Sequence, residues 1–177
     1  MSRPDIAMKE GMTMAEVTIE GATVSTNGEL PKVGDQLPAF TLADAELKDV
    51  TLDDFAGKRI VLNIFPSVDT PTCQAQLRTF NKQASSLDNT VVIGVSVDLP
   101  FAQERFCGAE GLDDVHTFSA FRSSFGKDYG VVLSDGDFAG LFARAVLVAD
   151  ETGKVVHSQI VPSVDDEPDY EAALAAL

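Results

Sequence analysis

The chain has two cysteines in 177 residues, and Cys73 stands where a sulfur could be chemically active. The apolar run 60–65 predicts a buried strand. Thr70 followed by Pro71 is a typical helix start, with threonine as N-cap and proline as the first helical residue. This count makes Cys73 the third residue of the helix. Free N–H groups and the positive end of the helix dipole favour an anion there. A thiolate is such an anion, and it is the reactive form of cysteine.

The same spacing is compatible with a purely structural cysteine. Cys73 begins a 4-3-4-3 pattern on one helix face, which continues with Leu77, Phe80, Ala84 and Leu87. A small buried cysteine that packs under the helix would produce this pattern as well. Spacing alone therefore does not separate a reactive cysteine from a core residue.

A longer motif favours the reactive interpretation. Pro66, Thr70 and Cys73 form the pattern Pro-x-x-x-Thr-x-x-Cys, which resembles the active-site signature of peroxiredoxins. The segment 63–81 is most similar to the thiol peroxidase branch of that superfamily, and the resemblance extends from about residue 31 to residue 177. It implies reduction of hydrogen peroxide and of alkyl or lipid hydroperoxides, with thioredoxin as reductant, in a homodimer. It implies no cofactor and no metal.

The resemblance also implies roles for individual residues. Cys73 would be the peroxidatic cysteine, which peroxide oxidises to a sulfenic acid. Thr70 would form hydrogen bonds at the sulfur and the peroxide oxygens, and Pro66 would shield the pocket. Arg144 interrupts the apolar strand predicted over 143–149, and the similar segment of thiol peroxidases holds its arginine against the reactive cysteine. A lone arginine in a buried strand is costly unless it is paired; an edge-strand arginine that points into water is the alternative.

Cys107 is the second cysteine, and the segment 99–112 resembles the resolving region of thiol peroxidases of the atypical two-cysteine type. The resemblance implies that Cys107 resolves the sulfenic acid through an intramolecular disulfide with Cys73. We expect Cys107 in the last turn of a short helix that begins at Pro100 and ends at Gly108. A disulfide needs Cα atoms about 4.4–6.8 Å apart, so both helices would have to unwind locally. A buried hydrophobic role is the alternative for Cys107.

Composition excludes several classes of function. Thirteen basic and 28 acidic side chains give a formal net charge of −15, which argues against nucleic acid as a partner. No apolar run approaches the ~18 residues of a membrane span, and residues 1–15 lack the apolar core of a secretory signal. We therefore expect a cytoplasmic protein without membrane contact. Two cysteines are too few to staple a domain of this size, and such a pair is more often catalytic or redox-sensing.

Three other functions compete with a peroxidase. A thioredoxin-like oxidoreductase would need Cys-x-x-Cys at the helix start, but Gln76 stands three residues after Cys73. A metal-binding module could use only Cys73, Cys107, His116 and His157, which lack paired ligand spacing. A non-catalytic redox or interaction module could hold Cys73–Cys107 as a static structural disulfide. Titration of free thiols before and after one equivalent of peroxide separates this module from an enzyme.

The order of predicted elements indicates an α/β fold. Residues 17–25 read as a β-hairpin, and two strand–helix–strand units follow. The expected remaining elements are short strands at 40–42 and 50–52, strands at 59–65, 90–97, 115–118, 143–149 and 155–161, and helices at 71–87, 100–108, 123–129 and 168–177. The apolar strand 90–97 is expected at the centre of the sheet. This order is similar to the thioredoxin fold, a mixed central sheet flanked by helices, with an N-terminal β-hairpin extension. We expect one domain over 15–177 after a flexible extension over 1–14.

Overall fold

A mixed seven-stranded sheet runs through residues 14–177, the part of the chain that this computed structural model describes. The extension expected over 1–14 lies outside the described residues except for Met14. In chain order the elements are β1 (Glu16–Ile19), β2 (Ala22–Ser25), β3 (Thr41–Ala43), β4 (Asp49–Thr51), η1 (Leu52–Phe55), β5 (Arg59–Ile64), α1 (Pro71–Ala84), β6 (Thr90–Ser96), α2 (Pro100–Glu110), β7 (His116–Ser119), α3 (Phe125–Tyr129), β8 (Ala145–Ala149), β9 (Val155–Ile160) and α4 (Tyr170–Ala175).

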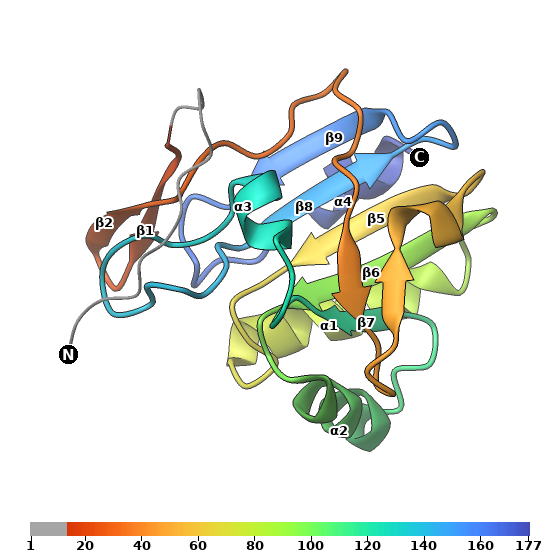
Figure 1. Cartoon of the computed structure of the whole chain (residues 1–177), viewed down its shortest axis with the longest axis horizontal. Coiled ribbons are helices and arrows are strands. Elements are labelled where there is room, and N and C mark those ends of the chain that lie inside the picture. The colour runs from red at the N-terminus through yellow and green to blue at the C-terminus, as the bar shows by residue number, and fades with distance from the viewer. Residues whose placement is uncertain (1–13) are drawn as a thin grey trace.

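The strand order in the large sheet is β4-β3-β7-β6-β5-β8-β9 (Figure 1). Strand β6 lies in the middle and runs parallel to both β5 and β7, which confirms its predicted central place. Helices α1 and α2 make the two crossovers between these parallel strands. The β8–β9 hairpin pairs antiparallel to β5 on one side, and β3 pairs antiparallel to β7 on the other. The carboxyl ends of β5 and β6 therefore open at the same edge of the sheet.

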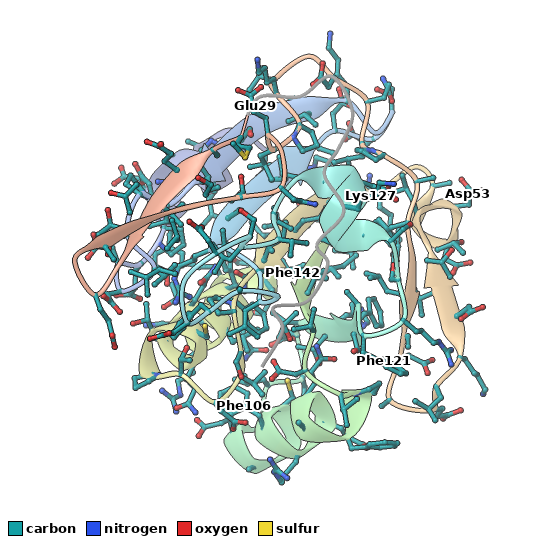
Figure 2. The ribbon with its side chains drawn as sticks, turned by 60° about the vertical axis from the view of Figure 1, so that its left-hand side comes forward. Glu29, Asp53, Phe106, Phe121, Lys127 and Phe142 are labelled. Carbon is teal, nitrogen blue, oxygen red and sulfur yellow. The ribbon has the colours of Figure 1, made fainter. Side chains whose placement is uncertain are left out.

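Alternating side chains of the strands build a separate core on each face of this sheet. On β5, Ile60, Leu62 and Ile64 face one core, which η1 and α3 cover. Val61 and Phe65 face the other core, which α1, α2 and α4 cover. Burial on both faces explains why the central strands read as continuous apolar runs rather than as an alternating pattern. Under α3, the ring of Phe142 lies 5.9 Å from that of Phe125 (Figure 2).

Several predicted helix boundaries are wrong. Helix α1 ends at Ala84 rather than near residue 87, and α3 begins at Phe125 rather than at Ser123. Two further errors arise from capping. Helix α2 does not end at Gly108 but continues to Glu110, because Gly111 is the residue that adopts the left-handed conformation (φ 67°) which ends a helix. Helix α4 begins at Tyr170 rather than at Pro168, because the Asp169 side chain accepts a hydrogen bond from Ala172 N–H as N-cap. Cys107 therefore lies about one turn before the end of α2.

The β1–β2 hairpin packs against the polypeptide that follows β9. Its side chains Val17, Ile19 and Val24 form a third small core with Leu133, Ala143 and Val164. Backbone bonds reinforce this contact, since Thr18 N–H donates to Pro162 O at 2.7 Å and Val164 N–H donates to Thr18 O at 3.1 Å. The hairpin thus fixes the backbone position of Val164.

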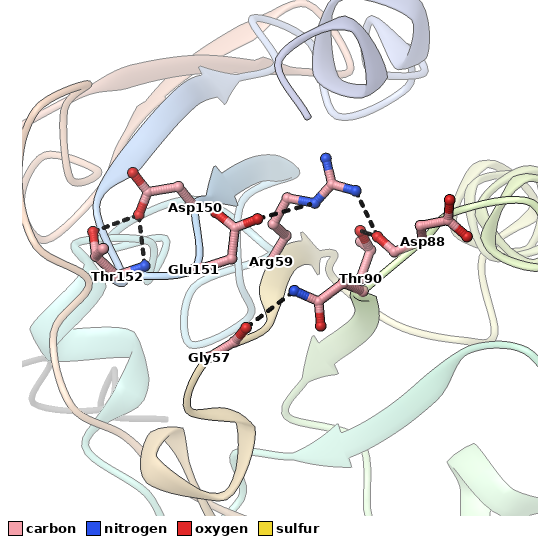
Figure 3. Close-up of polar contacts among 8 residues, drawn as sticks. Gly57, Arg59, Asp88, Thr90, Asp150, Glu151 and Thr152 are labelled. Atoms are coloured by element: carbon pink, nitrogen blue, oxygen red, sulfur yellow. Dashed lines mark hydrogen bonds and ion pairs between the residues drawn. The ribbon is translucent and has the colours of Figure 1, made fainter.

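Polar contacts connect neighbouring segments at the amino end of β5, the end away from Cys73 (Figure 3). Arg59 Nη2 donates to Asp88 O at 2.5 Å, and its Nε lies 3.8 Å from a carboxylate oxygen of Glu151 in the β8–β9 turn. Asn89 Nδ2 donates to Gly57 O at 3.1 Å. These contacts join β5 to the segments that precede β6 and follow β8. The loop that leads to Cys73 leaves β5 at its other, carboxyl end.

Candidate active site

Cys73 is the third residue of α1 and is fully buried, with 0% of its surface exposed. Thr70 is the N-cap, and its hydroxyl oxygen accepts a hydrogen bond from Cys73 N–H at 3.4 Å. The same hydroxyl donates to Ser67 O at 3.3 Å. Thr70 thus braces the start of the helix at Cys73, and the positive end of the helix dipole favours a negative charge there.

Arg144 contacts Cys73 although 71 positions separate the two residues in the chain. It immediately precedes β8, and only 1% of its surface is exposed. Its Nη1 donates to the Cys73 sulfur at 3.3 Å and to Gln76 Oε1 at 2.6 Å. Its Nε and Nη2 donate to Val164 O at 3.0 and 2.7 Å. A buried guanidinium with these partners has a fixed direction toward the sulfur, and the alternative of a solvated edge-strand arginine does not apply.

Gln76 and Asn63 complete a buried polar chain that sequence reasoning did not find. Gln76, one turn after Cys73, accepts from Arg144 through Oε1 and donates through Nε2 to Asn63 Oδ1. Asn63 is a fully buried residue of β5 that pairs with Gly94 and Val146. The available signal was a polar residue at each of two apolar positions, one in the strand 60–65 and one on the Cys73 face of the helix.

The backbone after β9 supplies the other side of the arginine cradle. Val164 O accepts two of the donors of Arg144, and the adjacent Asp165 O accepts from Thr72 Oγ1 at 3.2 Å. Because the hairpin strand β1 holds Val164 N–H, the N-terminal hairpin, the end of β9 and the first turn of α1 all converge on Arg144. Main-chain carbonyls carry no sequence signature, which is why this contact was not predicted.

The loop 65–70 between β5 and α1 is tied to the end of β6. Pro66 in this loop is buried. The next two residues bind Asp98, since Ser67 Oγ donates to one carboxylate oxygen at 2.7 Å and Val68 N–H donates to the other at 2.9 Å. Asp98 is a further residue of the site region that the sequence did not single out, although it lies two residues after the end of β6.

Cys107 lies on the face of α2 that packs on β7, with its sulfur 3.6 Å from Thr117 Oγ1. Burial raises the pKa of the Cys107 thiol, and the hydrogen bond with Thr117 opposes this by a smaller amount. Both cysteines are free thiols. Cys107 also lines a surface hollow of about 220 Å³ between α2 and the residues that precede β4. The second thiol is thus half-buried but lines a hollow at the surface.

The two cysteines stand over different strands. Cys107 lies over Thr117 of β7, whereas Gln76, in the helix turn after Cys73, lies over Asn63 of β5. These strands are separated by β6, and two strand spacings amount to about 10 Å. A disulfide tolerates Cα atoms no more than about 7 Å apart. The folded helices therefore keep the thiols beyond bonding distance.

The other polar candidates lie elsewhere. Arg78 is half-exposed, pairs with Glu110 at 2.8 Å and lies over the ring of Phe106. His116 and His157 lie on β7 and β9, with β6, β5 and β8 between them. Among residues 14–177 there is no group of three or more His, Cys, Asp or Glu side chains that could hold a metal. None of the helices described there is long and apolar enough to cross a membrane.

The site thus consists of a buried cysteine at a helix N-terminus with an arginine on its sulfur, set in a mixed sheet flanked by helices. The model of the Redoxin family matches residues 32–174, and the chain belongs to the thiol peroxidase branch of this family. It is 54% identical over 164 residues to a thiol peroxidase of Mycobacterium tuberculosis, covering 93% of this chain and 99% of that protein. A thiol peroxidase of Corynebacterium glutamicum is 53% identical with the same coverage.

Solved structures agree with this assignment. A peroxiredoxin-like protein from Aquifex aeolicus superimposes with a TM-score of 0.86 at 34% identity, covering 92% of this chain and 96% of the other. The thiol peroxidase from Chromobacterium violaceum superimposes with a TM-score of 0.84 at 26% identity, covering 90% and 94%. The predicted thioredoxin-like fold and the predicted family are therefore confirmed. The protein is a peroxiredoxin-type peroxidase, an oxidoreductase that reduces peroxides at the expense of thiols.

Proposed function

We propose that Cys73 is the peroxidatic cysteine of this enzyme and that Cys107 resolves its sulfenic acid by forming an intramolecular disulfide, which thioredoxin then reduces. The observation that supports this assignment most directly is the contact between Arg144 Nη1 and the Cys73 sulfur at 3.3 Å. A buried cation and a helix N-terminus both stabilise a thiolate, and the two act on the same sulfur here.

In the first step the Cys73 thiolate attacks the terminal oxygen of a hydroperoxide. An S–O bond forms, the O–O bond breaks, and the second oxygen leaves with a proton as water or an alcohol. The sulfur is oxidised to a sulfenic acid and the peroxide is reduced. Negative charge moves from the sulfur to the leaving oxygen, so a donor fixed at the site stabilises the transition state more than a mobile one would. The contacts to Gln76 and Val164 fix Arg144 in this way.

Thr70 and Pro66 have supporting roles in this proposal. The Thr70 hydroxyl donates to the Ser67 carbonyl in this structure. A peroxide oxygen can take the place of that acceptor without moving the helix, which would place the hydroxyl donor at the reacting atoms. Pro66 is buried in the loop that leads to the helix, and its ring lacks an N–H, so it excludes water without offering a competing donor.

Resolution requires a change of conformation. The Cys107 thiolate attacks the sulfenic sulfur of Cys73, the S–S bond forms, and the hydroxyl leaves with a proton as water. Because the two cysteines stand over strands on either side of β6, the first turn of α1 and helix α2 from its start through Cys107 must unwind before this attack. Unwinding also exposes Cys107 to water, which removes the burial that raises its thiol pKa and increases its thiolate fraction.

We also propose a homodimer that acts on alkyl and lipid hydroperoxides as well as hydrogen peroxide, in the cytoplasm. The support for a protein interface is the exposure of Leu99, Phe101 and Phe121, at 51%, 58% and 42%. Leu99 and Phe101 begin α2 beside Asp98. Phe121 N–H donates to Ser119 Oγ, which in turn donates to Asp98 O. All three apolar side chains thus lie near Asp98, the residue to which the loop 65–70 is bound.

Thiol titration with peroxide tests the proposed chemistry. The reduced protein has two thiols, and one equivalent of hydroperoxide is expected to remove both within seconds, with an intramolecular Cys73–Cys107 disulfide as the product. Thioredoxin with its reductase should restore both thiols. Slow loss of thiols, or loss of one thiol per peroxide with no disulfide, contradicts the two-cysteine cycle. Sedimentation of the reduced protein at micromolar concentration tests the dimer, which Phe101→Asp should weaken because a buried charge disfavours an apolar contact.

A further inference from the structure

Asp98 lies between the two segments that carry the cysteines. It lies two residues after the end of β6 and directly precedes Leu99, the N-cap of α2. On one side its carboxylate oxygens accept hydrogen bonds from Ser67 Oγ at 2.7 Å and Val68 N–H at 2.9 Å. Both donors belong to the loop 65–70, which leads to Cys73. The carboxylate therefore holds this loop to the end of the central strand.

On the other side Asp98 is connected to the interior of α2. Ser96 Oγ donates to Asp98 Oδ2 at 2.5 Å, and the same hydroxyl accepts from Gln103 Nε2 at 3.0 Å. Gln103 Nε2 also donates to Phe118 O on β7 at 3.0 Å. Ser96 and Gln103 are buried, at 0% and 1% exposure. The chain Ser67–Asp98–Ser96–Gln103 thus runs without a gap from the peroxidatic loop to α2.

Gln103 stands one helical turn before Cys107. Residues four apart lie on the same helix face, and both side chains here contact β7, Gln103 at the Phe118 carbonyl and Cys107 at Thr117. Unwinding α2 as far as Cys107 therefore pulls Gln103 from Ser96 and from β7. Among the described residues Gln103 Oε1 is already a buried acceptor without a partner, so the amide is held by its donor side alone.

Ser67 and Asp98 are partly exposed, but Ser96 and Gln103 are buried, and there the loss of one partner leaves the other unsatisfied in a medium of low dielectric. Opening of the loop 65–70 frees the Asp98 carboxylate and weakens the hold of Ser96 on Gln103. Unwinding of α2 has the reverse effect on the loop. The two movements that disulfide formation needs are therefore linked energetically, and such a linkage acts equally in both directions.

We propose that Asp98, through Ser96 and Gln103, is a positioning residue that couples opening of the loop at Cys73 to unwinding of α2 at Cys107. The inference rests on the proposed function, in which these movements precede attack of Cys107 on the sulfenic acid. Coupled release presents the resolving thiol whenever the oxidised sulfur is uncovered, and so limits the time in which a second peroxide could oxidise the sulfenic acid to a sulfinic acid.

Hydrogen exchange of the reduced protein tests the coupling without any peroxide chemistry. Ser67→Ala perturbs only the loop, and Gln103→Leu perturbs only α2. Each variant is expected to speed amide exchange at both 66–73 and 100–108 by roughly three- to tenfold, the factor that corresponds to one lost hydrogen bond. Amides of β5 over 60–64 should keep their wild-type rates, which excludes a general loss of stability. Asp69→Asn, in the same loop with an exposed side chain, is the matched control and should change neither segment.

Asp98→Ala removes the connection itself. It should speed exchange in both segments, and adding Gln103→Leu to it should have no further effect on the loop. In stopped-flow measurements of oxidised enzyme, Ser67→Ala and Gln103→Leu should both accelerate disulfide formation by a similar factor. If each single variant changes exchange only in its own segment, the coupling is refuted, whether or not Asp98→Ala folds. Refutation of the coupling would not affect the peroxidase activity of the wild-type enzyme. Failure of the proposed function would appear instead as turnover retained in Cys73→Ser, and it would not alter the exchange rates of the Ser67 and Gln103 variants.

Discussion

Arg144 Nη1 and the Cys73 sulfur lie 3.3 Å apart although 71 positions separate the residues in the chain. The arginine does not reach the sulfur as a flexible surface side chain. Its other donors bind the Gln76 side chain and the Val164 carbonyl, so α1, β8 and the segment after β9 hold it from three directions. A cation fixed in this way needs no reorganisation when charge moves during the reaction.

Removal of this cation should slow the first chemical step. In Arg144→Met the rate of sulfenic acid formation is expected to fall by roughly 10²–10³-fold, as for loss of one preorganised donor, and alkylation of Cys73 at neutral pH should slow as well. Arg144→Lys keeps the charge but loses the planar set of donors, so it should recover only part of the rate. Arg78→Met, at a half-exposed arginine, serves as the control. Equal peroxide rates for Arg144→Met and Arg78→Met would show that Arg144 takes no part.

Cys73→Ser should abolish thiol-dependent peroxide reduction. A serine hydroxyl is scarcely ionised near neutral pH and is a poor nucleophile without an adjacent base. The substitution is small and stays within the capped first turn of α1, so circular dichroism should show an unchanged fold. Steady-state peroxide consumption with thioredoxin and its reductase measures the effect. Turnover near the wild-type level would remove Cys73 from the mechanism.

Cys107→Ser should separate the two halves of the cycle. Sulfenic acid formation is expected at the wild-type rate, because Cys107 acts only after Cys73 has been oxidised. A single peroxide equivalent should then leave a sulfenic acid that dimedone traps at Cys73, and recycling by thioredoxin should fail or slow greatly. Mass spectrometry of the trapped protein reads out both. Full cycling without any trapped adduct would assign resolution to another thiol source.

Gln76 and Arg144 should act as a unit. Gln76→Leu leaves Asn63 Oδ1 and one N–H of Arg144 without their present partner, and each such group costs about 1–3 kcal/mol of unfolding free energy when it is buried. The peroxide rate should fall because the guanidinium is less firmly held. In the double variant with Arg144→Met the two effects on rate should not add. Additive effects in this cycle would mean that Gln76 does not act through the arginine.

The reactivity of Cys107 should depend on the fold. Burial raises the pKa of this thiol, so less of it is thiolate at a given pH than in the unfolded chain. In the Cys73→Ser background, iodoacetamide should therefore modify Cys107 more slowly in the native protein than in urea, and the native rate should keep rising with pH after the unfolded rate has levelled. Thr117→Val removes the hydrogen bond that lowers the pKa and should slow the native reaction further. Identical pH profiles for native and unfolded protein would exclude a shifted thiol.

The sequence by itself determined the features that depend on near neighbours. Thr70 and Pro71 start α1, and this places Cys73 at the third helical position, because a cap and a proline act within one turn. The unbroken apolar run 90–97 marks the central strand β6, because only a strand buried on both faces needs no polar side. The motif around Cys73 was sufficient to indicate the family.

The tertiary structure alone decided what surrounds the sulfur. The contacts of Arg144 with Gln76 and with the Val164 carbonyl join positions 68 and 20 residues apart, and a local pattern does not record such distances. Nothing in the sequence marks Asp98 as the acceptor for the loop 65–70, whose Ser67 and Val68 donate to its carboxylate. The end of α2 at Gly111 rather than Gly108 depends on which glycine adopts a left-handed backbone, since both residue types allow it and the local sequence does not choose between them.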